Sequence, residues 1–376
     1  MNAFTARDSI ARSGFRDLKV VAKVKESAII TSFHIEPANP QDWLAFEPGQ
    51  FLVFRIPVPR EAAGDKGYVL RNYSVSSSPG AAGRYRISVK REAAPAPGLP
   101  DGKSSCFLHD EVDVGHVLTA QGPRGDFVLD KTSTRPVVLL SGGVGLTPMV
   151  SMLHALASMS DRRAVFIHAC ESGDVHALRD EVTDLVATRP GLAVHYCYRS
   201  PTERDKADQR FHSEGMISPE ILQRLLPIDD YDFYLCGPPP FMQAIYALLR
   251  ELGVPKHRIA YEFFGPATVL EPDAVRAPAV PAQPARIEAA GEATTVEFRK
   301  SGLTAVWDGS AASLLDFAEN QGLLPEFSCR AGICGTCKSH LISGDVDYFE
   351  EPLDELNAGE VLLCCSKPRG SVVLDI

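Results

Sequence analysis

Four cysteines near the end of the chain have a spacing that can hold a pair of iron atoms. Cys329, Cys334 and Cys337 follow the pattern C-x4-C-x2-C, and Cys364 comes later in the chain. In a 2Fe-2S cluster of this spacing, three thiolates come from one tight loop and the fourth from another segment. A structural zinc site usually pairs two C-x2-C units, and this segment has only one. The spacing therefore predicts a 2Fe-2S cluster.

The surroundings of these cysteines resemble plant-type ferredoxins. The segments "EFSCRAGICGTCKSHLISGDVDY" and "VLLCCSKP" match that family's cluster loop and its distal cysteine segment, and the resemblance covers about 298–376. Glycines in the loop, Gly332 and Gly335, would let backbone N–H groups turn toward the cluster sulfurs. The resemblance implies Cys364 as the fourth ligand, and leaves Cys365 as a buried structural thiol.

A second group of polar side chains, Arg71, Asn72, Tyr73 and Ser74, forms the short pattern R-x-Y-S. Taken alone, these four residues also fit an ordinary strand with polar edges. The guanidinium of Arg71 can pair with a phosphate through its fork of donors. Tyr73 offers an aromatic face and a hydroxyl group to a planar ring. Alone, the pattern does not identify its ligand, and the segments around it carry the assignment.

The order of segments around this pattern resembles the flavin-binding barrel of the ferredoxin–NADP reductase superfamily. "FEPGQFLVFRIP" precedes the pattern and "GRYRISVKRE" follows it, most closely as in the reductase half of flavohaemoglobins. The resemblance implies that Ser74 hydrogen-bonds the flavin N5 atom. It also implies that "GKSSCFLHD" contacts the pyrophosphate, with close backbone approach at Gly102 and a hydroxyl from Ser105.

Both FAD and FMN are open as the flavin. The phthalate dioxygenase reductase group has the same three-domain order and uses FMN, whereas the flavohaemoglobin-like group uses FAD. "RIAYEFFGPA" is similar to the flavin-covering segment of the latter group, which would place Glu262 and Phe264 near the flavin, with Phe264 on the ring. Composition alone also fits a buried aromatic strand. We expect FAD.

A glycine-rich turn could bind a nicotinamide nucleotide. In "VVLLSGGVGLTPM", Gly142, Gly143 and Gly145 follow an apolar run, and Thr147 and Pro148 open a helix. The N-terminus of a helix after such a turn can cradle a pyrophosphate, because its N–H groups and dipole favour anions. The turn is not G-x-G-x-x-G, so the superfamily resemblance supports the assignment.

In the segment "YLCGPPPFM", the resemblance implies that Cys236 lies beside the reacting carbon and that Gly237 and Pro238 shape the turn. The alternative for Cys236 is a core thiol.

The choice between NADH and NADPH depends on two charged residues. Glu171 follows the apolar run "AVFIHAC", where an acid can hold a ribose 2′-hydroxyl and repel a 2′-phosphate. Arg199 could instead attract that phosphate. We expect NADH, with NADPH as the alternative.

Three domains can position these residues. Short β-rich segments with turns predict a barrel, and alternating strands and helices predict a doubly wound α/β domain. A Pro- and Ala-rich stretch without an apolar period predicts a linker. The expected order is an antiparallel flavin-binding β-barrel at 15–130, an NAD(P)-binding α/β domain at 131–266, a linker at 267–286, and a β-grasp-like plant-type 2Fe-2S ferredoxin domain at 287–376.

Composition narrows the class of partner. The 376 residues include 38 Lys plus Arg and 48 Asp plus Glu, a net charge of −10, which argues against nucleic acid and anionic membranes as main partners. No apolar stretch is long enough to span a bilayer, and 1–17 lack the apolar core of a signal peptide. We expect a soluble cytoplasmic protein. The ten histidines are scattered, without metal-ligand spacing, and the oligomeric state is left open.

Together these features predict an NADH-dependent oxidoreductase of the ferredoxin reductase type. NADH would reduce the flavin, and the cluster would pass single electrons to an acceptor protein. The resemblance implies the terminal oxygenase of a Rieske-type multicomponent system as that acceptor. A haem-thiolate monooxygenase and a hybrid-cluster protein are alternatives. Two other hypotheses are a redox-responsive iron–sulfur binding protein and an NADH–flavin diaphorase with a structural cluster.

Overall fold

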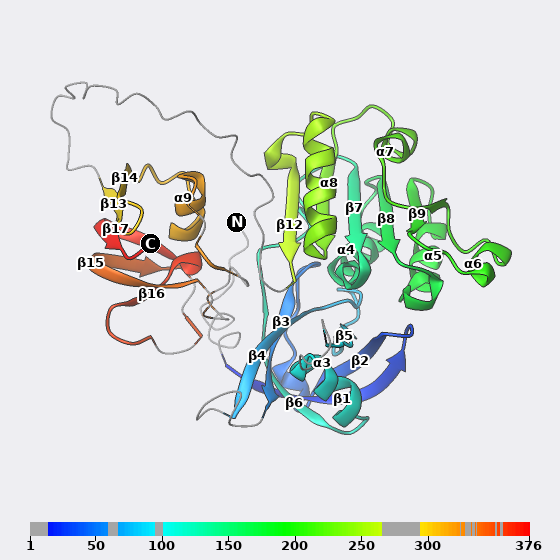
Figure 1. Ribbon diagram of the computed structural model, residues 1–376. Coiled ribbons are helices and arrows are strands. Elements are labelled where there is room, and N and C mark those ends of the chain that lie inside the picture. The colour runs from blue at the N-terminus through cyan, green and yellow to red at the C-terminus, as the bar shows by residue number, and fades with distance from the viewer. Residues whose placement is uncertain are drawn as a thin grey trace. The chain divides into compact units, whose positions relative to one another are not determined.

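The computed structural model describes residues 14–58, 67–94, 101–264, 294–323, 325–327, 332, 335, 337–349, 352–353 and 356–376. The chain divides into two compact units, Met1–Phe264 and Gly265–Ile376 (Figure 1). The expected linker at 267–286 lies outside the described residues, as do Cys329 and Cys334.

The first unit begins with a six-stranded antiparallel sheet. Its strands pair in the order β4-β3-β6-β1-β2-β5, and a bridge between Val75 and Ile87 joins the two edges into a barrel. Side chains of one face fill the interior because successive residues of a strand point to opposite faces; on β1, Leu18 and Val20 are fully buried. The strands are β1 (Arg16–Lys25), β2 (Ile30–Pro37), β3 (Phe51–Pro57), β4 (Tyr68–Ser74), β5 (Tyr85–Lys90) and β6 (Val117–Arg124), and helix α3 (Lys103–Glu111) lies between β5 and β6 in the chain.

The rest of the first unit is a parallel sheet whose strands alternate with helices (Figure 1). The strand order is β10-β9-β8-β7-β11-β12, so the chain reverses direction across the sheet between β7 and β11. In open α/β sheets, ligands bind outside the carboxyl ends of the strands at such a point. The strands are β7 (Val137–Gly142), β8 (Ala164–Cys170), β9 (Leu192–Tyr198), β10 (Ser213–Glu214), β11 (Asp232–Gly237) and β12 (Ile259–Phe263).

Helices cover this sheet, and their apolar faces form its core. Helix α4 is the most buried, with ten of its side chains away from solvent. The helices are α4 (Leu146–Met159), α5 (Arg179–Ala187), α6 (Glu203–Ala207), α7 (Pro219–Leu225) and α8 (Pro239–Glu251). Ile30 and Phe127 from the barrel part belong to the same core cluster as α4, so the barrel and the α/β layer share apolar packing.

The second unit is a five-stranded mixed sheet with one helix among its described residues. Its order is β14-β13-β17-β15-β16, in which only β13 and β17 are parallel. Ser313 caps the helix by accepting a hydrogen bond from the Asp316 amide, as a polar residue before an apolar run predicts. The elements are β13 (Thr295–Phe298), β14 (Leu303–Val306), α9 (Leu314–Asn320), β15 (Lys338–Tyr348), β16 (Glu360–Leu362) and β17 (Ser366–Leu374).

The fold class expected from the sequence is confirmed, since the chain contains an antiparallel barrel, a parallel α/β layer and a mixed C-terminal sheet in that order. Within the part of the chain that the structure describes, no helix is long and apolar enough to cross a membrane.

Candidate active site

Three of the predicted site residues meet where the barrel adjoins the parallel sheet. Ser74 is the last residue of β4 and is buried. Glu262 lies on β12, in register with Cys236 on the neighbouring strand β11. A hydrogen bond joins the Ser74 side chain to the Glu262 carboxyl group. The two strands of the parallel sheet thus bring an acid and a thiol to one end of the barrel.

The carboxyl group of Glu262 is held in its neutral form. Burial raises its pKa to about 8, because a charged carboxylate loses its hydration there, and the hydrogen bond from Ser74 opposes the rise only in part. Although the residue as a whole is half-buried, its Oε2 atom is shielded from solvent and has no hydrogen-bond partner in the structure. A buried polar atom without a partner is costly in a finished protein, so Glu262 fits a site that a ligand completes.

The thiol of Cys236 is fully buried and stays protonated. Burial raises its pKa well above the ordinary value, and the nearby Glu262 adds to the rise. A protonated, solvent-shielded thiol is a poor nucleophile. Its position therefore suits packing against a ligand better than covalent chemistry.

The strand β4 presents the other residues of the R-x-Y-S pattern on alternating faces. Tyr73 is half-buried, and its ring meets that of Phe54 edge to face at 5.8 Å. Burial raises the pKa of Tyr73, while Arg71 lowers it and Glu92 raises it, which places both charges near the hydroxyl group. Arg71 is exposed, and its guanidinium donates to the Leu70 carbonyl at 2.7 Å. Asn72 is half-buried on the opposite face of the strand from Arg71.

The start of α3, a helix that packs against β3 and β5, leaves backbone donors available. Gly102 is the N-cap residue and provides no side-chain cap, so the first N–H groups of the helix are open to an anion. A Cβ atom at Gly102 would lie 2.8 Å from both the Glu92 Cβ and the Ser105 Oγ, so only glycine fits. Ser105 Oγ donates to the Gly102 carbonyl and accepts from the Glu92 amide, each at 3.1 Å. The Ser105 hydroxyl thus joins the start of α3 to the backbone just after β5.

The glycine turn after β7 packs against the end of β11. A Cβ atom at Gly145 would lie 2.5 Å from the Cys236 carbonyl carbon and 2.7 Å from the Gly237 amide nitrogen. The ring of Phe241 occupies the space beside Gly142 and Gly237 in the same way. Side chains at these glycines would therefore separate the two strand ends at the reversal point of the sheet.

Gly143 and the first turn of α4 complete this edge. Gly143 adopts a φ of +52°, which disfavours other residues, and a Cβ atom there would meet nothing within 4 Å. Thr147 Oγ1 donates to the Val144 carbonyl at 3.1 Å, and Pro148 is buried in the first turn. Pro238 is the N-cap residue of α8 and makes no side-chain cap. The open space at Gly143 and the uncapped helix start suit a phosphate.

The two charged residues relevant to nucleotide choice are neighbours. Glu171 follows β8 and Arg199 follows β9, at the carboxyl ends of adjacent strands. Both side chains are exposed, and the Arg199 Nη1 lies 4.0 Å from the Glu171 Oε2. Backbone hydrogen bonds from Arg199 to the Cys170 carbonyl and from Ser200 to the Glu171 carbonyl hold the two loops together.

Phe264 is half-buried at the end of the first unit and packs against the core cluster of the α/β part. It follows β12 and is two residues from Glu262, so it leaves the sheet close to the candidate site. Its contact with a flavin ring stays a prediction.

In the second unit, the two described cluster cysteines are buried. Cys337 and Cys364 are 3% and 4% exposed. The Gly332 amide donates to the Cys364 Sγ at 3.3 Å, the kind of bond that a cluster sulfur accepts. Cys365 instead donates from its thiol to the Leu362 carbonyl at 3.7 Å. These contacts support Cys364 as the ligand. The donor set fits a 2Fe-2S cluster, with Cys329 and Cys334 outside the described residues.

Two residues of the site lie inside quoted motifs, but the sequence alone assigns them no role. Glu92 shapes the Gly102 corner, and Phe241 fills the space beside two glycines. Glu92 ends the segment "GRYRISVKRE", and Phe241 lies in "YLCGPPPFM". Only the pairing of distant elements shows what they touch.

Three family profiles match the chain in the order in which the domains occur. The profile described as "Oxidoreductase FAD-binding domain" matches residues 17–129, "Oxidoreductase NAD-binding domain" matches 139–246, and "2Fe-2S iron-sulfur cluster binding domain" matches 297–369. These matches identify domains for FAD, a nicotinamide nucleotide and a 2Fe-2S cluster.

Comparison with individual proteins separates the FAD- and NAD-binding part of the chain from the 2Fe-2S domain in the same way. A flavohemoprotein of Bacillus thuringiensis is 43% identical over 258 residues, and the match covers 68% of this chain and 62% of that protein. The chain thus spans less than two thirds of the curated relatives that it matches. The flavohem-like FAD/NAD-binding domain of nitric oxide dioxygenase from Vibrio cholerae is 36% identical, with 66% of this chain and 98% of that chain covered and a TM-score of 0.57. Phthalate dioxygenase reductase shares the fold at 24% identity, with 96% and 98% covered and a TM-score of 0.56.

Proposed function

Because the chain belongs to the family of oxidoreductases with flavohaemoglobin-like FAD- and NAD-binding domains, and also carries a 2Fe-2S domain, we propose that it is an NADH-dependent reductase for a separate acceptor protein. We propose as acceptor the terminal oxygenase of a Rieske-type multicomponent system. The fold shared with phthalate dioxygenase reductase supports this choice. The observation that carries the reductase proposal is the meeting of Ser74, Glu262 and Cys236 at the edge between barrel and parallel sheet.

The residues of this edge fit FAD and a nicotinamide nucleotide. FAD accepts a pair of electrons from the nicotinamide, and the 2Fe-2S cluster carries electrons singly. The uncapped start of α3 and Arg71 would bind the FAD pyrophosphate, and the turn at Gly143 would bind that of the nucleotide. The unpartnered Oε2 of Glu262 would contact the flavin, with the proton of that carboxyl group retained near neutral pH. Cys236 would exclude water.

The proposal is tested by anaerobic titration of the purified protein with NADH and NADPH, followed by visible absorbance. We expect NADH to bleach the flavin and iron–sulfur bands together, and NADPH to do so more slowly. In the Cys334→Ser variant, the flavin should still bleach, while reduction of cytochrome c should fall strongly because the cluster has lost a ligand.

Other outcomes would favour the other hypotheses. If NADH bleaches the flavin and leaves the cluster oxidised, or if Cys334→Ser reduces cytochrome c at the wild-type rate, the protein is a diaphorase with a structural cluster. If neither nucleotide bleaches either group within minutes, the reductase proposal is wrong and a redox-responsive binding protein is favoured.

We propose that Glu171 selects NADH by accepting a hydrogen bond from the ribose 2′-hydroxyl. The exposed position of Glu171 beside Arg199 supports this, since either residue can reach a ribose bound at the strand ends. The Glu171→Gln variant should raise the ratio of kcat/KM for NADPH to that for NADH by about tenfold, equivalent to about 1.4 kcal/mol. Arg199→Gln is the matched control and should not raise it. An unchanged ratio in Glu171→Gln would count against the assignment.

The acceptor is tested by reconstitution. The chain has a net charge of −10, so docking on a basic acceptor should weaken as salt is added. We expect NADH-dependent turnover of a Rieske oxygenase to saturate with oxygenase concentration and to decrease from low to physiological salt. If a haem-thiolate monooxygenase turns over with NADH and the Rieske oxygenase does not, the proposed acceptor is wrong and the haem-thiolate enzyme takes its place.

A further inference from the structure

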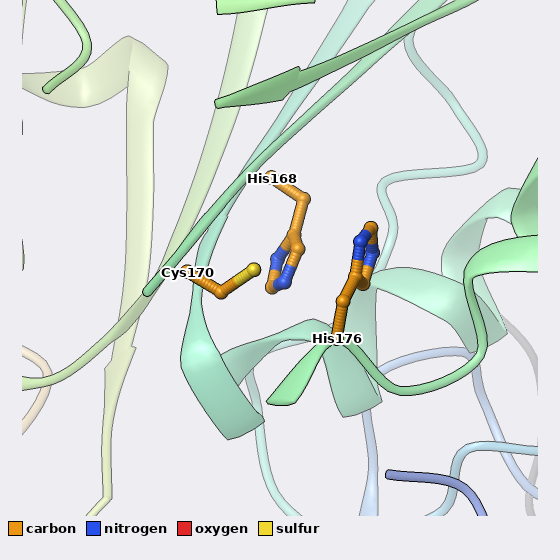
Figure 2. Close-up of side chains that lie close together, drawn as sticks. All are labelled: His168, Cys170 and His176. Atoms are coloured by element: carbon orange, nitrogen blue, oxygen red, sulfur yellow. The ribbon is translucent and has the colours of Figure 1, made fainter. Parts of the chain in front are cut away.

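Two histidines and a cysteine lie together at the carboxyl end of β8, in a cluster that the reductase proposal does not use. His168 and Cys170 are two residues apart on β8, so their side chains leave the same face of the strand. His176 follows the short turn Gly173–Val175. One ligand atom of each residue lies within 4.8 Å of the other two. Figure 2 shows the sulfur of Cys170 directed toward the His168 ring, which faces the His176 ring.

We propose that His168, Cys170 and His176 form a binding site for a zinc-like transition-metal ion. Imidazole nitrogens and a thiolate sulfur are the ligands that zinc takes most readily. A tetrahedral zinc with bonds of about 2.0–2.3 Å requires ligand atoms about 3–4 Å apart, so small side-chain rotations would suffice. Three protein ligands leave one position for water.

One ring nitrogen of His168, Nε2, has no hydrogen-bond partner in the structure, and the residue is fully buried. Leaving a buried polar atom unpaired costs about 1–3 kcal/mol. A metal ion bound to this nitrogen would remove that cost. The orphan atom separates this arrangement from an ordinary pair of core histidines, in which both ring nitrogens are satisfied.

The other ring nitrogens are held by hydroxyl groups. The His168 Nδ1 lies 2.9 Å from the Ser141 Oγ, and the His176 Nδ1 lies 2.8 Å from the Tyr198 hydroxyl. A metal-binding imidazole usually bonds its second nitrogen to such a partner, which fixes the ring. Both rings are thus oriented before an ion arrives, with their centroids 4.5 Å apart.

A buried carboxylate adds negative charge near the cluster. Asp205 is 3% exposed and accepts a hydrogen bond from the Gly173 amide, within the turn that joins Cys170 to His176. Burial raises the pKa of the Cys170 thiol, and the charge of Asp205 raises it further, so release of the thiol proton has to be driven by the metal ion. Burial lowers the pKa of His176, and Arg179 and Arg210 add to the lowering. The thiolate formed on binding supplies a further negative charge directly to the ion.

Binding of a divalent ion balances with the loss of one proton. The cation forms a bond to the Cys170 sulfur, and the thiol proton leaves to solvent.

The site is tested by equilibrium dialysis of the holoprotein against zinc chloride, with zinc, iron and FAD measured in the same sample. Wild type should bind about one zinc ion per chain that the Cys170→Ser variant does not bind. Cys106→Ser is the matched control, because Cys106 is another half-buried thiol of the same unit, and should bind zinc as wild type does. Iron and FAD contents report whether each variant is intact.

A second variant leaves all three ligands in place. Tyr198→Phe removes the hydroxyl that orients His176 and should weaken zinc affinity about 10- to 100-fold. If Cys170→Ser loses iron or FAD, the Tyr198→Phe result decides. Equal zinc binding by wild type and Cys170→Ser, no zinc bound by wild type, or an unchanged affinity in Tyr198→Phe would each overturn the proposal.

Discussion

Glu262 is the residue whose protonation most distinguishes the candidate active site. Its carboxyl group sits between Ser74 of the barrel and Cys236 of the parallel sheet. Burial holds its pKa near 8, so the folded chain keeps a proton that a carboxyl group in water loses near 4.5. The strand "RIAYEFF" identifies Glu262 as a candidate by resemblance. The raised pKa could not be predicted, because it comes from burial of the carboxyl group beside β11, which the register of β12 sets. The Ser74 bond that partly opposes the rise comes from another sheet.

Stability should therefore fall as pH rises through the range between these two values. Between about pH 4.5 and 8 the unfolded chain has lost a proton that the folded chain retains, so rising pH favours unfolding. In wild type, the free energy of unfolding should fall by on the order of a few kcal/mol from pH 5 to pH 8. The Glu262→Gln variant should not show this fall. Urea unfolding midpoints at several pH values measure the effect.

The control is Glu251→Gln, which changes an exposed glutamate at the end of α8. It should leave the pH profile of the midpoints as in wild type. A Glu262→Gln profile that still falls between pH 5 and 8 would show that another group is responsible.

At the scale of elements, the turn from β7 into α4 determines how closely two strands meet. Gly145 rests against the backbone of Cys236 and Gly237, and Phe241 lies beside Gly142. The glycines and the order strand–turn–helix were readable from the sequence, as was the alternation that predicts the parallel sheet. The reason for glycine at 145 was not, because it depends on the approach of β11, which comes some 90 residues later.

Gly145→Ala should weaken nucleotide binding. The new Cβ would lie within about 2.5 Å of the β11 backbone, so the turn must move away from the strand end. We expect NAD⁺ affinity to fall about tenfold or more, with a loss of stability of about 1–3 kcal/mol from overpacking. Calorimetric titration and urea unfolding measure the two effects.

Gly80→Ala serves for comparison. Only the Ser78 Oγ, at 3.6 Å, lies near a Cβ built there, so neither affinity nor stability should change much. Wild-type NAD⁺ affinity in Gly145→Ala would show that the turn does not position the nucleotide.

On the largest scale, one ion-pair network ties the barrel to the α/β layer. Arg86 of β5 donates from Nη1 and Nη2 to the two carboxylate oxygens of Glu181 on α5, at 2.5 and 2.8 Å. His154 of α4 lies 2.6 Å from the same carboxylate. Although burial opposes ionisation, the bonds from His154 and Arg86 lower the pKa of Glu181 to about 2. Sequence reasoning missed this link, since its members lie 95 residues apart in different domains.

Arg86→Gln should destabilise the first unit strongly. It removes two bonds from the partly buried Glu181, which keeps its bond to His154, and should cost about 1–3 kcal/mol. The wild-type contribution is fully present above about pH 4.5 and is lost as pH falls toward 2. The difference in urea midpoint between variant and wild type should therefore shrink on acidification.

Arg84→Gln is the control, at the residue directly before β5. Arg84 pairs with Glu36 at 2.6 Å, but both side chains are exposed, so its loss should cost no more than about 1 kcal/mol. Equal effects of the two substitutions would mean that the Arg86–Glu181 pair does not join the domains energetically.

The burial of Cys236 has a consequence for survival of the protein in oxidising conditions. Flavin proteins that meet oxygen generate peroxide, which attacks thiolates that solvent can reach. Cys236 is fully buried, and its pKa is raised well above the ordinary thiol value, so almost no thiolate forms and no reagent can approach. A sulfur atom at the candidate active site can therefore persist unmodified, and alkylating reagents should label it only after the strand end opens.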